Sequence, residues 1–248
     1  VNIKERLDFS CAVFSPEGAL VANAPHVPVH LGSMDASVET VIRRQGANMR
    51  PGDVYMLNAP YDGGTHLPDI TVITPVFDDA GSEILFFVAS RGHHEDIGGL
   101  SPGSMTPRAK TIEEEGVLID CVKLVDDGRF LEAEVIALLT EVKYPARRPD
   151  KNIADLKAQI AANARGAAEI GKLLALYGRE VVQAYMGHVQ DNAEESIRRL
   201  ISRLSDGHHR VETDSGSVVE VTIKINREAR EATIDFTGTS PARDDNFN

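Results

Sequence analysis

Two glycine-rich loops of the sequence each carry a histidine and an aspartate three residues apart. The pairs are His66 with Asp69 and His93 with Asp96. Imidazole nitrogens and carboxylate oxygens together suit Zn²⁺, Mn²⁺ or Fe²⁺, and a mixed set with open positions is typical of catalytic metal sites. Either pair alone often caps a turn or bonds to the backbone. Because both pairs occur in one chain, we predict that these four residues bind a divalent metal.

Three further histidines are candidates for proton transfer beside that metal. Histidine is the side chain best suited to transfer protons near neutral pH. His94 follows His93 directly, and His26 and His30 lie in a proline-containing segment. We predict catalytic roles for His94, His30 and His26. A role as metal ligand or as partner of a ligand also stays open for His94, as does a packing or turn role for the other two.

These loops must be positioned by strands. Alternating or continuous apolar residues predict strands at residues 7–13, 54–57, 70–77 and 84–89, the first of them in a hairpin with residues 19–22. His66 and Asp69 precede one strand, whereas His93 and Asp96 follow the next. The two pairs therefore share one end of a sheet only if those strands are antiparallel. The short connection 78–83 favours that arrangement.

Helical spacing of apolar residues marks two other regions. A short amphipathic helix is predicted over 34–42, with Ser33 placed to cap its N-terminus. Residues 151–205 show the same periodicity over a longer stretch. We predict two or three helices there, interrupted near Gly178 and Gly187.

Alternation returns near the end of the sequence. Residues 219–225 and 232–236 read as two strands joined by a turn, which predicts an antiparallel hairpin. We therefore predict an α+β fold with a mixed or antiparallel sheet. Its three predicted parts are an α/β metal-site domain at 1–150, a helical segment at 151–205, and a β-hairpin at 206–248 that begins a truncated β-rich region.

Composition and charge exclude several classes of protein. The 248 residues are 42% hydrophobic, enough to bury a sizeable core. A net charge of −12 without a basic stripe argues against nucleic-acid binding. No run approaches the ~20 apolar residues of a membrane span, and the first residues are too charged for a signal peptide. Cys11 and Cys121 lack metal or disulfide spacing. We expect a cytoplasmic protein that contacts neither membrane nor nucleic acid.

One phosphate-binding pattern is rejected. Residues 166–172 have the glycine and lysine spacing of a P-loop, but Leu173 stands where Ser or Thr would ligate Mg²⁺. A helical rather than a strand-like segment precedes it. We predict that this chain binds no ATP itself.

Long motifs in the same order resemble those of the hydantoinase B / oxoprolinase family. They lie at residues 5–12, 26–34, 58–71, 91–99 and 235–240, so the likeness runs almost end to end. The family includes a subunit of ATP-dependent N-methylhydantoinases, the C-terminal half of 5-oxoprolinase, and large subunits of acetone and acetophenone carboxylases. Its members are substantially longer, so we expect part of the C-terminal portion to be missing here.

The resemblance implies a division of labour. A separate hydantoinase A type subunit would bind ATP and phosphorylate a small cyclic amide such as a hydantoin or 5-oxoproline. This chain would complete ring opening at its metal, within a hetero-oligomer. The resemblance gives His66, Asp69, His93 and Asp96 the metal roles. A ketone carboxylase subunit and a non-catalytic assembly scaffold remain alternatives, because one fold serves several chemistries.

Overall fold

The computed structural model describes residues 2–24 and 27–244, and the chain divides into two compact units, Val1–Ala184 and Tyr185–Asn248. Helices combine with antiparallel strand pairs, which confirms the predicted α+β class. The division into three domains stays a prediction. None of the helices within 2–24 and 27–244 has the length and apolar character needed to cross a membrane.

The elements follow one another closely along the chain. The helices are α1 (Asn2–Arg6), α2 (Pro28–Leu31), α3 (Met34–Gln45), η1 (Gly46–Asn48), η2 (Pro60–Asp62), α4 (Ile112–Glu115), α5 (Glu132–Thr140), α6 (Pro149–Tyr177) and α7 (Arg179–Ile201). The strands are β1 (Phe9–Phe14), β2 (Leu20–Asn23), β3 (Val54–Leu57), β4 (Asp69–Phe77), β5 (Ile84–His93), β6 (Val122–Asp126), β7 (Arg129–Phe130), β8 (Gly207–Glu212), β9 (Val218–Asn226) and β10 (Glu231–Asp235). Each predicted strand is present, whereas α5, β6, β7 and β8 were not predicted.

One sheet forms the centre of the first unit. Its described strands run in the order β2-β1-β5-β4-β3-β6-β7, and each neighbouring pair is antiparallel. β4 and β5 are direct neighbours, with Asp69 opposite His93. The predicted antiparallel pairing of these strands is therefore confirmed.

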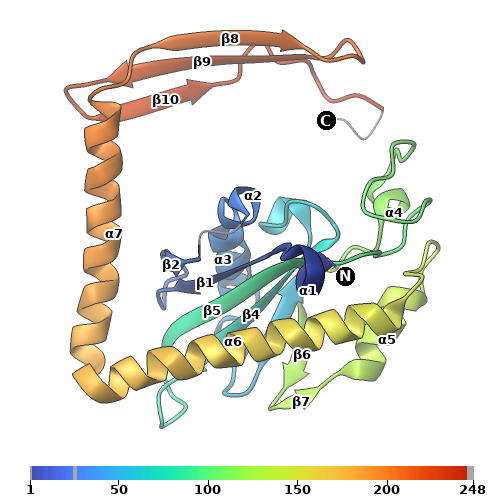
Figure 1. Ribbon diagram of the computed structural model, residues 1–248, viewed down its shortest axis with the longest axis vertical. Coiled ribbons are helices and arrows are strands. Elements are labelled where there is room, and N and C mark those ends of the chain that lie inside the picture. Colours follow the sequence, from blue (N-terminus) through green and yellow to red (C-terminus); the bar gives the residue numbers. More distant parts are fainter. Residues whose placement is uncertain (1, 25–26, 245–248) are drawn as a thin grey trace. The chain divides into compact units, whose positions relative to one another are not determined.

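The sheet carries a hydrophobic layer on each face, because alternate residues of a strand point to opposite sides. Tyr55 and Leu57 join the cluster that includes Met34 and Val38 of α3, whereas Met56 joins the cluster of α6. In Figure 1, α3 covers one face of the sheet and α6 crosses the other.

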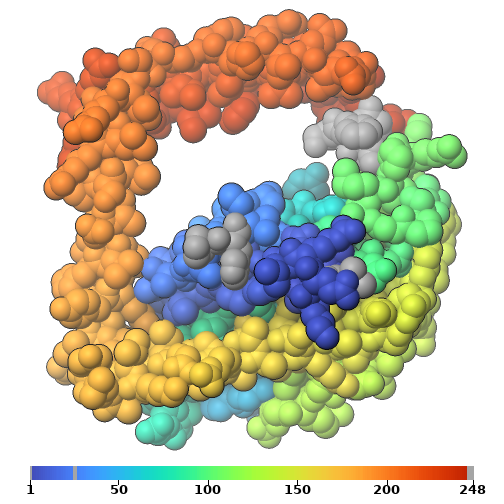
Figure 2. Space-filling model, in the orientation of Figure 1, coloured from blue at the N-terminus to red at the C-terminus, as the bar shows by residue number. Residues whose placement is uncertain are grey.

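Helix α6 is attached to its face of the sheet by buried amides as well as by apolar side chains. Gln159 Nε2 donates to the carbonyls of Ile70 and Ser90, at 2.9 and 3.1 Å. Asn163 Nδ2 donates to the carbonyl of Val72 at 3.0 Å. Figure 2 shows the dark-blue N-terminal segment beside the yellow α6. These bonds fix α6 along β4, which begins at the predicted site with Asp69, and along β5, which ends there with His93.

The second unit contains most of α7 and a sheet in the order β10-β9-β8. The predicted β9–β10 hairpin is confirmed by its antiparallel register. Arg230 holds the turn of that hairpin against α7, because its Nη1 lies 2.9 Å from Glu195 Oε2. The predicted helix break near Gly178 is present, whereas the one near Gly187 is wrong. A single glycine within a helix costs only about 1 kcal/mol, which the rest of α7 tolerates.

A fully buried arginine connects β5 to the segments around it. Arg91 donates from its guanidinium nitrogens to the oxygens of Thr71, His30, Ser33, Ser37 and Gly63. Burial lowers the pKa of Arg91 to about 10. Ser33 makes no capping bond to α3, so the predicted cap is wrong. Its hydroxyl is instead one of the acceptors of Arg91.

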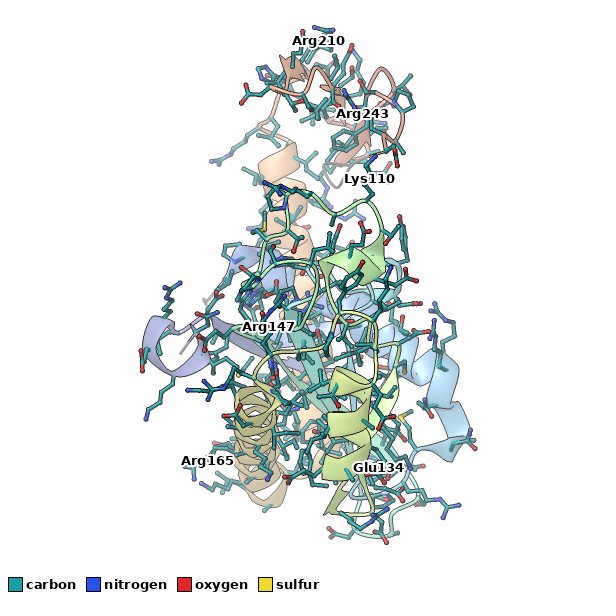
Figure 3. The ribbon with its side chains drawn as sticks, turned by 90° about the vertical axis from the view of Figure 1, so that its right-hand side faces the viewer. Lys110, Glu134, Arg147, Arg165, Arg210 and Arg243 are labelled. Atoms are coloured by element: carbon teal, nitrogen blue, oxygen red, sulfur yellow. The ribbon has the colours of Figure 1, made fainter. Side chains whose placement is uncertain are left out.

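Replacing Arg91 with methionine is expected to destabilise the protein strongly. The change keeps much of the buried volume but leaves several buried oxygens without a donor, so we expect the free energy of unfolding to fall by roughly 3–5 kcal/mol. Urea unfolding measures the difference. The matched control is Arg165→Met on α6, whose side chain is 76% exposed and projects outward in Figure 3. Equal stability of the two variants would contradict this account of Arg91.

Candidate metal site

His66, Asp69 and His93 form a group that can hold a metal ion. Each offers one ligand atom, and these atoms lie within 4.8 Å of one another, the only such group among the residues that the structure describes. Asp69 begins β4 and His93 ends β5, so the sheet register itself brings them together. His66 reaches them from the loop before β4. Three of the four predicted ligands are therefore adjacent.

The carboxylate of Asp69 is the centre of this group. His93 Nδ1 lies 2.6 Å from its Oδ1, and His30 Nε2 lies 3.5 Å from its Oδ2. His66 Nδ1 is 4.0 Å from the same Oδ2. Burial alone would raise the pKa of Asp69, but the hydrogen bonds with His30 and His93 and their charge outweigh it and hold the pKa well below its usual range. The carboxylate of Asp69 is therefore ionised at neutral pH.

The ring of His66 is oriented by a backbone carbonyl. Its Nε2 lies 2.6 Å from the oxygen of Ser104, which can only accept, so Nε2 carries the proton. The other ring nitrogen, Nδ1, faces Asp69. A ligand histidine whose second nitrogen donates to a carbonyl is the usual arrangement around protein-bound metals.

His30 lies beside the group, as the sequence suggested, and brings a further acid with it. Its side chain is buried, Nδ1 lies 3.2 Å from Ser10 Oγ, and Nε2 lies 3.8 Å from Asp8 Oδ1. Asp8 was not predicted as a site residue. Two signals were available, since Asp8 lies directly before β1 and within the motif at residues 5–12. His26, the remaining catalytic candidate of that segment, lies outside the described residues.

The structure does not bring Asp96 to the predicted ligands. Its carboxylate accepts from the backbone nitrogen of Arg147 at 3.0 Å and from Nη1 of the same residue at 2.8 Å. Burial alone would raise the pKa of Asp96, but these bonds to Arg147 and those from backbone amides lower it. β5 ends at His93, so Asp96 lies in the loop after the strand and not at the strand end. The three-residue spacing therefore places it away from Asp69.

His94 points to the opposite face of the sheet from His93. It is fully buried, with Nε2 3.1 Å from Gln159 Oε1 and Nδ1 3.1 Å from Asn152 Nδ2, both on α6. Because the amide oxygen accepts and the amide nitrogen donates, these contacts define a neutral ring protonated at Nε2. Burial lowers the pKa of His94. Both nitrogens are thus engaged in packing α6 against β5, and its predicted catalytic role remains a prediction.

The loop that carries His66 is held by a buried asparagine and a close backbone approach. Asn58 Nδ2 donates to the carbonyls of Leu67 and Val117, and its Oδ1 accepts from the amide of Ile119. Gly64 lies so near this segment that a Cβ there would come 2.1 Å from the carbonyl oxygen of Asn58. Only glycine fits without moving the loop. The sequence offered a weak signal for Asn58, a polar residue directly after a buried strand.

Replacing Gly64 with alanine should therefore destabilise the protein. The backbone must shift to remove the clash, and we expect a loss of roughly 2 kcal/mol or more in the free energy of unfolding. Gly171→Ala is the control, since no atom lies within 4 Å of a Cβ there and α6 should gain up to about 1 kcal/mol. Urea unfolding of both variants gives the comparison. A neutral Gly64→Ala would show that the loop adjusts freely.

Comparison with known proteins agrees with the α+β fold. The family model described as Hydantoinase B/oxoprolinase matches residues 1–248. The chain is 48% identical over 271 residues to 5-oxoprolinase 1 of Arabidopsis thaliana, an alignment that covers 100% of this chain and 21% of that protein. It is 45% identical over 261 residues to 5-oxoprolinase of Saccharomyces cerevisiae, covering 100% of this chain and 20% of that protein.

Two solved structures share the fold. The ATP-dependent caprolactamase from Pseudomonas jessenii superposes with a TM-score of 0.78 at 30% identity, over 92% of this chain and 39% of that one. An acetone carboxylase superposes with a TM-score of 0.86 over 100% of this chain and 35% of that one. Its sequence identity is 18%, so it shows the fold alone.

The fold and the site together define the class of this protein. It is an α+β protein with two histidines and an aspartate grouped at the end of an antiparallel sheet. The chain belongs to the hydantoinase B/oxoprolinase family, as its motifs predicted. It spans about a fifth of the length of the 5-oxoprolinases that it matches.

Proposed function

We propose that this chain supplies the metal centre of an ATP-dependent enzyme that opens a small cyclic amide of the hydantoin or 5-oxoproline type. The observation that carries the proposal is the convergence of His66, Asp69 and His93 at one sheet end. The names of its relatives support the substrate class, since they include 5-oxoprolinases and an ATP-dependent caprolactamase.

The donor set fits a divalent cation. Two imidazoles and one carboxylate leave coordination positions open for substrate or water, as catalytic Zn²⁺, Mn²⁺ and Fe²⁺ sites require. Asp69 is buried and ionised, and His66 already has the outer hydrogen bond that directs Nδ1 inward. When bound, the metal would supply Lewis acidity toward a carbonyl or phosphoryl oxygen at neutral pH.

The neighbouring side chains provide a route for a proton. His30 Nε2 lies between the buried Asp69 and Asp8, whose side chain is 35% exposed. Because both carboxylates face the same ring nitrogen, Nε2 can take up a proton from one carboxylate and give that proton to the other. We propose that His30 passes protons between the site and Asp8, and that Asp8 exchanges them with solvent.

Activation of the amide is proposed to occur outside this chain. A lactam is stabilised by resonance and resists attack by water, so its oxygen is first phosphorylated at the expense of ATP. Residues 166–172, with the spacing of a P-loop, lie inside helix α6, where Lys172 pairs with Glu169. Phosphorylation is therefore proposed to take place in a hydantoinase A type region, on a partner subunit or on the same longer polypeptide.

A ketone carboxylase is the second candidate. The acetone carboxylase likeness covers the whole chain and supports it, but this likeness concerns the fold, which can host either chemistry. The higher sequence identity to proteins named 5-oxoprolinase favours cyclic amide hydrolysis. An assembly scaffold without a metal is the third alternative.

Elemental analysis tests the metal. We expect about one divalent ion per chain, and its loss when His66→Ala and His93→Ala are combined, because only one carboxylate then remains in the group. The matched control combines His188→Ala with His209→Ala, two exposed histidines of the second unit. Full metal content in the first double variant would overturn the assignment.

Phosphate release tests the reaction. We expect the full chain to hydrolyse 5-oxoproline or a hydantoin only with ATP and the A-type region present, because ring activation requires phosphorylation. Release that depends on bicarbonate and acetone instead would assign the carboxylase reaction. Turnover of the cyclic amide without ATP would contradict the proposed mechanism, and metal-independent release would support the scaffold role.

A further inference from the structure

The carboxylate of Asp96 accepts hydrogen bonds from several groups around it and so anchors the loop that follows. Its Oδ1 accepts from the amides of Gly98 at 3.1 Å and Arg147 at 3.0 Å, and its Oδ2 accepts from the amide of Gly103 at 3.3 Å. Nη1 of Arg147 completes the set at 2.8 Å from Oδ2. The carboxylate thereby ties both ends of the 98–103 loop to one point. In Figure 3, Arg147 lies beside the green loop and above α6.

Arg147 makes a second contact with the same loop. Its Nη2 donates to the carbonyl of Gly99 at 2.8 Å, so one guanidinium holds both Asp96 and the loop backbone. The loop also packs tightly, since a Cβ at Gly99 would come 2.4 Å from the carbonyl oxygen of Glu115. Two contacts from a planar guanidinium define an orientation that a single charge would not.

The anchored loop leads directly to the metal group. Ser104 follows Gly103, and its carbonyl oxygen is the partner of His66 Nε2 at 2.6 Å. A shift of the loop would move that oxygen and release the His66 ring. The ring could then rotate or carry its proton on Nδ1, the nitrogen that faces Asp69.

We propose that Asp96 and Arg147 are positioning residues that act through Ser104 to keep His66 protonated at Nε2 with Nδ1 directed to the metal site. The consequence for metal binding rests on the proposed function, whereas the state of the His66 ring does not. Groups that orient a ligand typically change metal affinity by about 10–100-fold when they are removed.

The test compares Arg147→Ala and Asp96→Asn with the unchanged chain. Asp96→Asn keeps the shape of the side chain but replaces one carboxylate oxygen with an NH₂ group. That group is a donor and would face the N–H groups from which the oxygen accepted. Arg147→Lys is a milder variant that keeps the charge and loses the second contact, should the others fail to fold. Arg148→Ala is the matched control, because this neighbour makes an exposed pair with Asp150 instead. Urea unfolding establishes that each variant is folded.

The first readout is nitrogen NMR of the metal-free full chain with labelled histidines. We expect one His66 tautomer, protonated at Nε2, in the unchanged chain and in Arg148→Ala, and a mixture of tautomers in the positioning variants. The second readout is Zn²⁺ affinity from competition with a chelator. We expect it to fall about 10–100-fold in the positioning variants and to stay unchanged in the control.

The outcomes separate the two proposals. If the His66 tautomer is unchanged in the folded Asp96 and Arg147 variants, the positioning role is wrong, whatever the metal does. If the unchanged chain binds no Zn²⁺ but the tautomer responds as expected, the proposed function fails and the positioning role stands. If Asp96→Asn removes metal while His66 stays in place, Asp96 is a direct ligand and the inference is overturned.

Discussion

A guanidinium group that is buried away from water needs an oxygen acceptor for each of its N–H groups. Arg91 is buried in this way, and its need for acceptors constrains the first unit. Its partners come from β4, from the α2–α3 region and from the carbonyl of Gly63. Thr71, Gly63 and Ser33 lie two or three residues from Asp69, His66 and His30. The carbonyl of His30 is itself an acceptor, and His93 follows Arg91 by two residues on the same face of β5. The spacing of the site is therefore set by how these segments satisfy one buried cation.

Much of this site follows from strand periodicity. Apolar runs and a short connection predict that β4 and β5 pair antiparallel, and this pairing alone places Asp69 opposite His93. The same period of two separates His93 from His94, since neighbouring residues of a strand point to opposite faces. His94 accordingly faces Gln159 of α6. If this alternation is extended one residue beyond β5, the sequence alone predicts that His94 points away from the face of His93 and packs on the other side of the sheet.

The remainder depends on loop paths, which periodicity does not describe. Asp96 meets Arg147 across 51 positions of sequence, and Ser104 meets His66 across 38. Neither contact has a sequence signature, because a backbone carbonyl carries no residue identity and an arginine pairs with any reachable carboxylate. The weakly patterned elements α5, β6 and β7 lie between Asp96 and Arg147 in the chain and were not predicted. A spacing of three residues thus identified His66 and Asp69 as neighbours but misplaced Asp96.

The three residues of the candidate metal site are held with unequal rigidity. Asp69 and His93 sit on paired strands whose register cannot shift without turning side chains to the other face. His66 comes from a loop, and its ring depends on a second loop that Asp96 and Arg147 anchor. Strands position site residues more precisely than loops do, and loops vary more readily between relatives. Within a family that uses one fold for different substrates, adaptation is therefore expected on the His66 side, where a ligand can be adjusted without disturbing the sheet.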